Sequence, residues 1–166
     1  IVGALKVKLR AEDEARVGHR GTQDVEAYDT MLRTRELIIS GSEGKVIEAR
    51  ILLQRILQND PNFAAAMGGL AFTYIMHFTN QWGENHQTAL NEAEKWVNKA
   101  IETDPKESYA WLSLAVMRVW QNRLDDAREA VARLHEVSPG SPDGLRILAT
   151  IENFSGNYQT AIDAFQ

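Results

Sequence analysis

Three prolines recur along this chain at nearly regular intervals, and they constrain its fold more than any other feature. Pro61, Pro105 and Pro139 are separated by 44 and 34 residues. Each one directly follows an aspartate or a serine that ends a run of apolar residues at helical spacing. A helix stops before such a proline, and the next helix is capped shortly after it. Self-similarity at this period indicates an array of repeated units that pack against their neighbours.

The interval of 34 residues is typical of the tetratricopeptide repeat, a helix–turn–helix unit with large and small residues at fixed positions. In the segment that ends at Pro139, only Arg118 departs from the pattern, because it stands where an aromatic residue is expected. The matching residues are Trp111, Leu114, Ala115, Ala127, Val131 and Leu134. The small residues let helix axes approach closely. The pattern predicts an all-α tetratricopeptide-repeat helical solenoid of antiparallel helix pairs in a right-handed superhelix, with seven or more helices and no sheet.

The repeat pattern divides the chain into five segments. They are an N-terminal helix or linker from a preceding domain (1–23), a degenerate unit (24–61), a unit with an inserted loop (62–105), a regular unit (106–139) and a truncated unit (140–166). The helix around Tyr28 to Ser40 is out of register, and a long loop is expected after it. Ten inserted residues are expected near His77 to Gln87. The last unit starts with Ser141 as the cap and Pro142 as the first helical residue, and both chain ends are expected to be cuts in a longer protein.

Composition narrows the class of partner. The 166 residues are 44% hydrophobic and 25% charged, which is enough for a folded core. Eighteen Lys and Arg against 23 Asp and Glu give a net charge of -5, and no basic stretch could neutralise a run of phosphates. No apolar run approaches the ~20 residues of a membrane span, and the lack of cysteine fits a reducing compartment. We therefore expect a cytoplasmic chain that binds neither nucleic acid nor membrane.

No motif for catalysis, cofactor binding or metal binding is apparent. Two of the four histidines, His77 and His86, fall near one another with Glu84, but their spacing matches no common pair of metal ligands. The run Gly41 to Lys45 differs from a phosphate loop because Val46 stands where Ser or Thr is required, and it is interpreted as a turn between helices. We expect no catalytic, cofactor-binding or metal-binding residue, and no enzyme activity of the chain itself.

A candidate binding surface follows from the repeat pattern, because the first helix of each pair lines the concave face of tetratricopeptide arrays. The inward positions of these helices are Phe72, Ile75, Met76, Leu112, Val116, Val119, Trp120, Arg146, Thr150, Asn153 and Phe154. Most of them are apolar, which excludes the family's Lys- and Asn-based clamp for C-terminal carboxylates. The expected partner is a protein or peptide that presents an apolar or amphipathic helix. For Leu112 and Val116, contact with the next helix is an equally good interpretation, whereas Trp120 and Phe154 lie near helix ends.

The start of the chain offers a second apolar surface. Ile1, Val2, Leu5 and Leu9 recur at helical spacing and predict an apolar stripe on one side of a short helix. Such a stripe must be buried against something. We expect it to cover apolar repeat surface, either in its own chain or in a second copy, with the groove near Phe72 as one candidate.

Several segments resemble a known family. The runs Ile1 to Leu9, Gly21 to Tyr28 and Leu32 to Arg35, together with Trp82-Gly83 before Ala93, are similar to the region around the start of the repeats in bacterial class III adenylate cyclases. The resemblance implies an upstream cyclase domain and a TolB-like α/β domain followed by tetratricopeptide repeats. None of the cyclase's metal-binding or nucleotide-binding residues matches a position in this chain.

These observations lead to a functional hypothesis with two alternatives. The chain is interpreted as a protein-interaction and regulatory module of a multidomain bacterial signalling protein, most simply an adenylate cyclase. The first alternative is the sensory or oligomerisation tail of a winged-helix transcription regulator, because such regulators carry the same repeat arrangement. The second alternative is a fragment of an enzyme.

Overall fold

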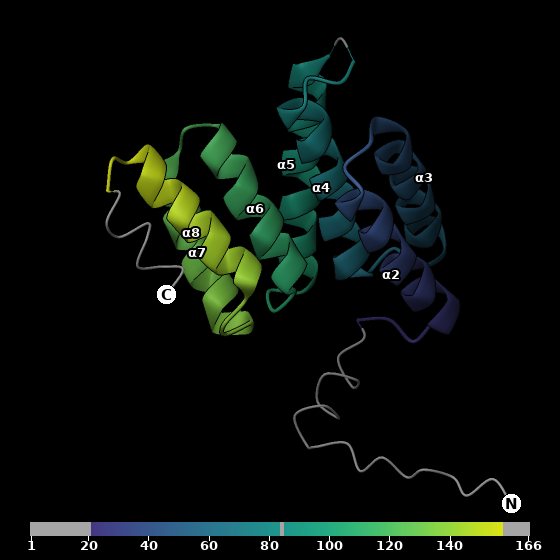
Figure 1. Cartoon of the computed structure of the whole chain (residues 1–166). Coiled ribbons are helices and arrows are strands. Elements are labelled where there is room, and N and C mark those ends of the chain that lie inside the picture. Colours follow the sequence, from purple (N-terminus) through teal and green to yellow (C-terminus); the bar gives the residue numbers. More distant parts are fainter. Residues whose placement is uncertain (1–20, 84, 158–166) are drawn as a thin grey trace, which may run out of the picture.

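The computed structural model describes residues 21–83 and 85–157, and all the secondary-structure elements in this part of the chain are helices (Figure 1). Its seven helices are α2 (Val25–Ile39), α3 (Glu43–Asn59), α4 (Ala64–Thr79), α5 (His86–Thr103), α6 (Ser108–Trp120), α7 (Leu124–Val137) and α8 (Pro142–Phe154). The prediction of seven or more helices without a sheet is confirmed for these residues. The predicted N-terminal stripe and the end of the last unit lie outside the described residues.

The helix ends predicted at the prolines are also confirmed. The residue before each proline caps a helix, and its backbone N–H donates a hydrogen bond to the carbonyl four residues earlier. The three caps are Asp60 of α3 (2.8 Å), Asp104 of α5 (2.9 Å) and Ser138 of α7 (2.8 Å). At the start of α8, the Ser141 hydroxyl accepts a hydrogen bond from the Gly144 N–H at 3.3 Å, and Pro142 is the first helical residue. The proline needs no donor at that position, because the first N–H groups of a helix have no partner inside it.

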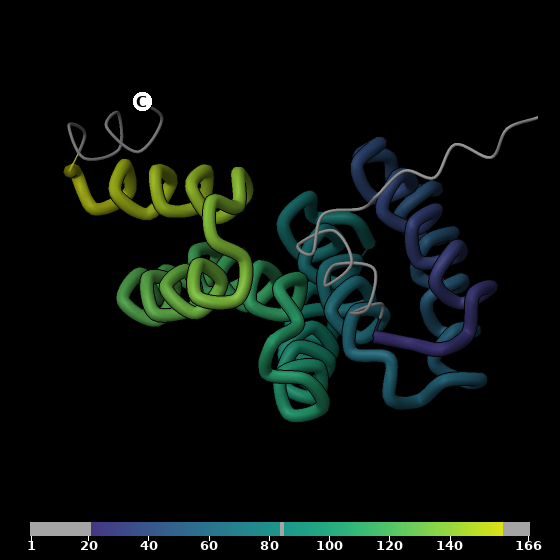
Figure 2. The backbone as a smooth tube through the Cα atoms, turned by 90° about the horizontal axis from the view of Figure 1, so that it is seen from below, coloured from purple at the N-terminus to yellow at the C-terminus, as the bar shows by residue number. Residues whose placement is uncertain are grey.

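The helices follow one another across the molecule in chain order. Figures 1 and 2 show α2 and α3 at one end, α4 and α5 in the middle, and α6, α7 and α8 at the other end. The helix α4 contacts α2, α3, α5 and α6, so it occupies the centre of the array. This position explains why every residue from Ala64 to Ala71 is buried, including Gly68 and Gly69. A helix that is apolar on all sides requires neighbours on all sides.

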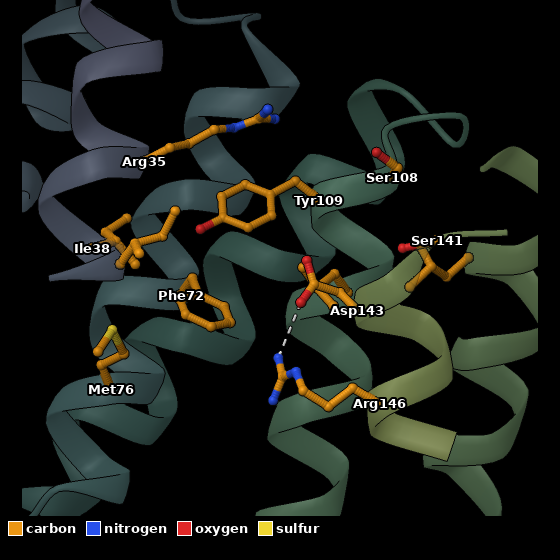
Figure 3. Close-up of a pocket in the computed structure, with 12 residues that line it drawn as sticks. Arg35, Ile38, Phe72, Met76, Ser108, Tyr109, Ser141, Asp143 and Arg146 are labelled. Atoms are coloured by element: carbon orange, nitrogen blue, oxygen red, sulfur yellow. Dashed lines mark hydrogen bonds and ion pairs between the residues drawn. The ribbon is translucent and has the colours of Figure 1, made fainter. Parts of the chain in front are cut away.

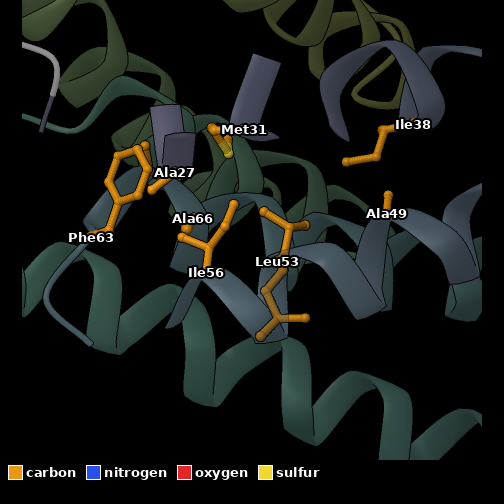
Figure 4. Packing of buried hydrophobic residues seen from close by; sticks show 10 residues of the cluster. Ala27, Met31, Ile38, Ala49, Leu53, Ile56, Phe63 and Ala66 are labelled. Atoms are coloured by element: carbon orange, nitrogen blue, oxygen red, sulfur yellow. The ribbon is translucent and has the colours of Figure 1, made fainter. Parts of the chain in front are cut away.

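Two apolar clusters form the core on either side of this centre. The first joins α2, α3 and α4, where Met31, Leu53 and Phe63 are almost fully buried (Figure 4). The second joins α6, α7 and α8 around Leu134 and Ile151. Smaller clusters on α4, α5 and α6 connect the two, so the apolar interior is continuous along the array.

The helices α4 and α6 approach each other closely at Gly68. A Cβ atom on Gly68 would lie 3.1 Å from the backbone nitrogen of Ala110, which is tighter than nine in ten real Cβ contacts. The Ser113 hydroxyl donates to the Gly68 carbonyl at 3.1 Å across the same contact. A side chain at residue 68 would therefore push the two backbones apart.

The turns differ from the prediction in two places. The turn after α2 contains only residues 40–42, so the long loop expected in the degenerate unit is absent. The ten extra residues of the next unit were expected in a loop, but only three lie in the turn. The other seven lengthen the helices, since α4 and α5 contain 16 and 18 residues where α6 and α7 contain 13 and 14.

Candidate functional site

A groove of about 470 Å³ lies between α2, α4, α6 and α8 (Figure 3). Its lining residues are Arg35, Ile38, Ile39, Phe72, Met76, Ser108, Tyr109, Leu112, Leu134, Ser141, Asp143 and Arg146. Most of the lining comes from the first helix of each successive pair. The groove has the size of a site for a few side chains of a bound segment rather than for a whole domain.

Two aromatic rings form the middle of the groove. The rings of Phe72 and Tyr109 stack with their centroids 5.7 Å apart, and the Arg35 guanidinium carbon lies 5.2 Å from the centroid of Tyr109. Burial raises the pKa of the Tyr109 hydroxyl. The nearby Arg35 cation lowers this pKa, and the Asp143 carboxylate raises it. The hydroxyl is therefore neutral at physiological pH and able to donate a hydrogen bond. In Figure 3 it points into the groove between α2 and α4.

The two cations that line the groove differ in their partners. Arg146 on α8 donates a hydrogen bond to Asp143, one turn earlier, at 3.2 Å. Arg35 on α2 is exposed, and no carboxylate in the described part of the chain lies within ion-pair distance of it. Within the described residues, the groove is thus apolar at its centre, with one ion-paired arginine and one arginine without a carboxylate partner on opposite sides.

The eleven residues expected on this surface lie in three different environments. Phe72, Met76, Leu112 and Arg146 line the groove. Ile75 is 1% exposed and packs with Ala93 and Met117 in the interior, while Val116 and Val119 pack against the α6–α7–α8 cluster. Trp120, Thr150, Asn153 and Phe154 lie farther along α6 and α8. Trp120 and Phe154 are 55% and 64% exposed, as expected for residues near helix ends.

Sequence reasoning missed the contribution of α2 to the groove. Arg35, Ile38 and Ile39 come from the helix that was considered out of register. Ile39 is 83% exposed at the end of α2, which is unusual for an isoleucine. A signal was present in the sequence, because Val25, Leu32 and Ile39 are spaced by seven residues and fall on one side of a helix.

The described residues contain no alternative site with the geometry of a metal centre. No group of three or more His, Cys, Asp or Glu side chains in these ranges could hold a metal ion. His77 Nδ1 and His86 Nε2 are buried without a hydrogen-bond partner in this part of the chain, beside the turn between α4 and α5. A second hollow, of about 340 Å³, lies between α7 and α8 and is lined mainly by apolar residues such as Val131, Leu145 and Leu148.

The described residues form a helical array with an open apolar groove. No family model matches the chain. Among curated proteins it is similar to a protein of Rhizobium meliloti (strain 1021) named "Putative adenylate cyclase 3", with 39% identity over 130 residues. The match covers 78% of this chain and 22% of that protein, so the chain spans about a fifth of the relative's length.

The name of this relative agrees with the cyclase part of the resemblance and does not mention repeats. Within the described ranges, no helix has both the length and the apolar character required to cross a bilayer.

Proposed function

We propose that this chain is a tetratricopeptide-type repeat module that binds an apolar or amphipathic helix of a protein partner in the groove between α2, α4, α6 and α8. The observation that carries the proposal is an open groove whose apolar lining includes Phe72, Met76 and Leu112, with the exposed Ile39 at its edge. Exposed apolar surface of this kind is typical of protein-interaction sites. The chain contributes binding energy in this proposal and performs no chemistry.

Recurrent turns between the units support the repeat interpretation. After α3, the Phe63 N–H donates to the carbonyl of Asp60 at 3.3 Å, and the equivalent bonds after α5 and α7 run from Glu107 to Asp104 (3.0 Å) and from Ser141 to Ser138 (3.2 Å). The aspartate side chains of the first two turns each accept a further backbone N–H, from Asn62 and Lys106. The same local geometry thus returns at the 44- and 34-residue intervals of the prolines.

The turns inside the units recur as well. The helices α4, α6 and α8 are each followed by a residue with positive φ, namely Gln81 (55°), Asn122 (57°) and Gly156 (79°). The next residue donates its N–H to a carbonyl five positions back, in the pairs Trp82 to His77, Arg123 to Arg118 and Asn157 to Glu152. This is the Schellman motif, which ends a helix and turns the chain back. We therefore propose units at 24–61, 62–105, 106–139 and 140–166, which stack into a solenoid.

The similarity to the Rhizobium meliloti protein supports a place for this module in a larger signalling protein. We propose that the larger protein is a cytoplasmic adenylate cyclase, in which the repeats regulate the enzyme or recruit a protein partner. The cyclase name of that relative favours this context over a winged-helix transcription regulator and over an enzyme fragment.

A designed peptide tests the proposed binding. The probe is an 18-residue helix with leucines at positions i, i+3, i+4 and i+7 and glutamates on its other side, labelled for fluorescence anisotropy. Ile39→Asp places a carboxylate at the groove edge and should weaken binding at least about tenfold, because burying an unpaired charge is unfavourable. Ile51→Asp is the matched control, since Ile51 is also exposed (53%) but lies on α3 outside the groove. Equal affinities of the peptide for the two variants would refute the proposal.

A further inference from the structure

The apolar surface of the groove continues along α2. Val25, Leu32 and Ile39 are 59%, 42% and 83% exposed, and their spacing of seven residues places them in one stripe on that helix. Ile39 lines the groove, so the stripe leads from the start of α2 into it. An exposed apolar stripe of this length requires a partner to cover it.

The edge of the groove on α2 also carries Arg35, which has no carboxylate partner among the described residues. Arg35 lies in the same half of α2 as Ile39, with its guanidinium over the ring of Tyr109. A cation over an aromatic ring still has its N–H groups free to bind a carboxylate. The surface along α2 is therefore suited to an apolar helix with acidic side chains at one end.

The N-terminal segment of this chain has both an apolar stripe and an acidic run, together with Lys6, Lys8 and Arg10. Ile1, Val2, Leu5 and Leu9 lie at helical spacing, and the acidic run Glu12-Asp13-Glu14 follows them after two residues. A helix of nine residues is about 13 Å long. Its apolar side would present to the groove three or four side chains of the kind that the groove can bury.

The attachment point of this segment is close enough. Gly21 lies against the ring of Phe63, and the Thr22 hydroxyl donates to the Asp60 carboxylate at 2.6 Å, so the described chain starts beside the first turn of α4. The ten residues from Val25 to Arg35 rise about 15 Å along α2. The six residues between Glu14 and Gly21 can extend over about 20 Å, which is sufficient to bring the acidic run to Arg35.

We propose that residues 1–14 occupy the groove as an intramolecular plug, with the apolar stripe against Phe72 and Leu112 and the acidic run at Arg35. This inference rests on the proposed binding role of the groove and names its resident occupant. A tethered segment acts at an effective concentration of about 1 mM, so an external helix must displace it to bind.

Disulfide trapping in the full chain tests the proposal. Because the sequence contains no native cysteine, only the two introduced cysteines can form the bond. The test pair is Leu5→Cys with Ile39→Cys, and the control pair is Leu5→Cys with Ile51→Cys. The N-terminal segment is attached near both Val25 and Asp60. Ile39 lies fourteen residues from Val25 along α2, and Ile51 lies only nine residues from Asp60 along α3. An undocked segment would therefore reach the control position more easily. Docking predicts at least about tenfold faster intramolecular bond formation in the test pair than in the control.

Neutralising the acidic run with Glu12→Gln, Asp13→Asn and Glu14→Gln should slow trapping of the test pair several-fold. Equal rates in the two pairs, or a bond that forms only between molecules, would overturn the proposal. The second of these outcomes would indicate a second copy as the occupant.

Titration with the designed peptide separates this proposal from the proposed function. Leu5→Asp with Leu9→Asp should disable the plug and increase the affinity of the full chain for the peptide about tenfold, because the tethered competitor is removed. If the peptide binds both chains equally well, the groove functions but the plug does not exist. If the peptide binds neither chain, the proposed function fails, and the trapping rates alone decide whether residues 1–14 dock.

Discussion

The central hairpin α4–α5 and the neighbouring hairpin α6–α7 end in similar turns but differ in length and burial. The central helices contain 16 and 18 residues, and the outer ones contain 13 and 14. In Figure 1 the turn between α4 and α5 projects beyond the adjacent helices. The extra helical turns carry His77 and His86 on either side of that projecting turn. Lengthening a hairpin at its free end thus adds side chains without disturbing the contacts between units.

The two hairpins differ more in how many of their residues are buried than in the lengths of their helices. Eight consecutive residues from Ala64 to Ala71 are buried in α4, whereas α7 buries only the stripe of Ala127, Ala130, Val131 and Leu134. The reason is that α4 has neighbours on all sides, and α7 faces solvent on one side. Substitutions should therefore be least tolerated where α4 meets its neighbours.

The largest effects are expected at two equivalent positions in the second helices. Ala93 in α5 and Ala127 in α7 are both fully buried and lie 34 residues apart. Replacing either by Trp should lower the free energy of unfolding by about 1–3 kcal/mol or more, because overpacking forces the helices apart. Ala132→Trp on the exposed side of α7 is the control. Thermal or urea unfolding measures the stability of all three variants. A large effect at only one of the two buried alanines would show that their positions in the two hairpins are not equivalent.

A smaller difference is expected between two glycines. A Cβ at Gly68 of α4 would meet the backbone of Ala110 at 3.1 Å, whereas a Cβ at Gly144 of α8 would meet a side-chain methyl of Leu134 at 3.3 Å. Backbone cannot give way as a methyl group can. Gly68→Ala should therefore destabilise by about 1–2 kcal/mol, while Gly144→Ala should be nearly neutral because alanine favours the helix. Similar unfolding midpoints for the two variants would show that α4 and α6 separate easily.

Sequence alone specified the helix ends well, because they depend on local chemistry. Prolines, capping serine and aspartate residues act within one turn of their own position, so α3, α5, α7 and α8 begin or end where the pattern predicted. The degenerate first unit was harder. The expected long loop is a three-residue turn at Gly41, whose φ of 70° lets the chain reverse at once.

The groove was predicted less completely, because it depends on how neighbouring helices are staggered. Tyr109 at the start of α6 reaches Phe72 in the middle of α4, a contact between positions that sequence spacing does not align. Arg118 illustrates the same limit. It stands where an aromatic residue was expected, and its guanidinium instead bonds Glu94 of α5 at 2.8 Å, a partner visible only after folding.

As the pH falls, the projecting end of the central hairpin should lose stability before the other parts of the array. Burial, with the nearby Arg50 cation and His86, lowers the pKa of His77, and Glu43 opposes this effect. The unfolded chain then binds more protons than the folded one, so stability should fall as the pH drops below about 6.5. His77→Asn should reduce this loss, and His135→Asn, at an exposed position on α7, is the comparison variant. Melting temperatures across this pH range provide the measurement, and an unchanged pH slope in His77→Asn would contradict the assignment.

The smallest effect is expected at the outer end of the array, where α7 meets α8. Arg128 Nε donates to Glu152 Oε1 at 2.9 Å, and Asn157 donates to the other carboxylate oxygen at 2.7 Å. The bonds from Arg128 and Asn157 hold the pKa of Glu152 below its usual value of 4.5. The stabilisation is therefore complete above that pH, and it is lost as the pH falls through the folded-state pKa. Glu152→Gln should flatten the acid limb of the unfolding curve, and Glu136→Gln, whose partner Arg133 lies on the same helix, is the comparison variant. If both variants keep the wild-type acid limb, α8 is held by its apolar contacts alone, and the ion pair plays no part in fixing the wall of the groove that carries Arg146.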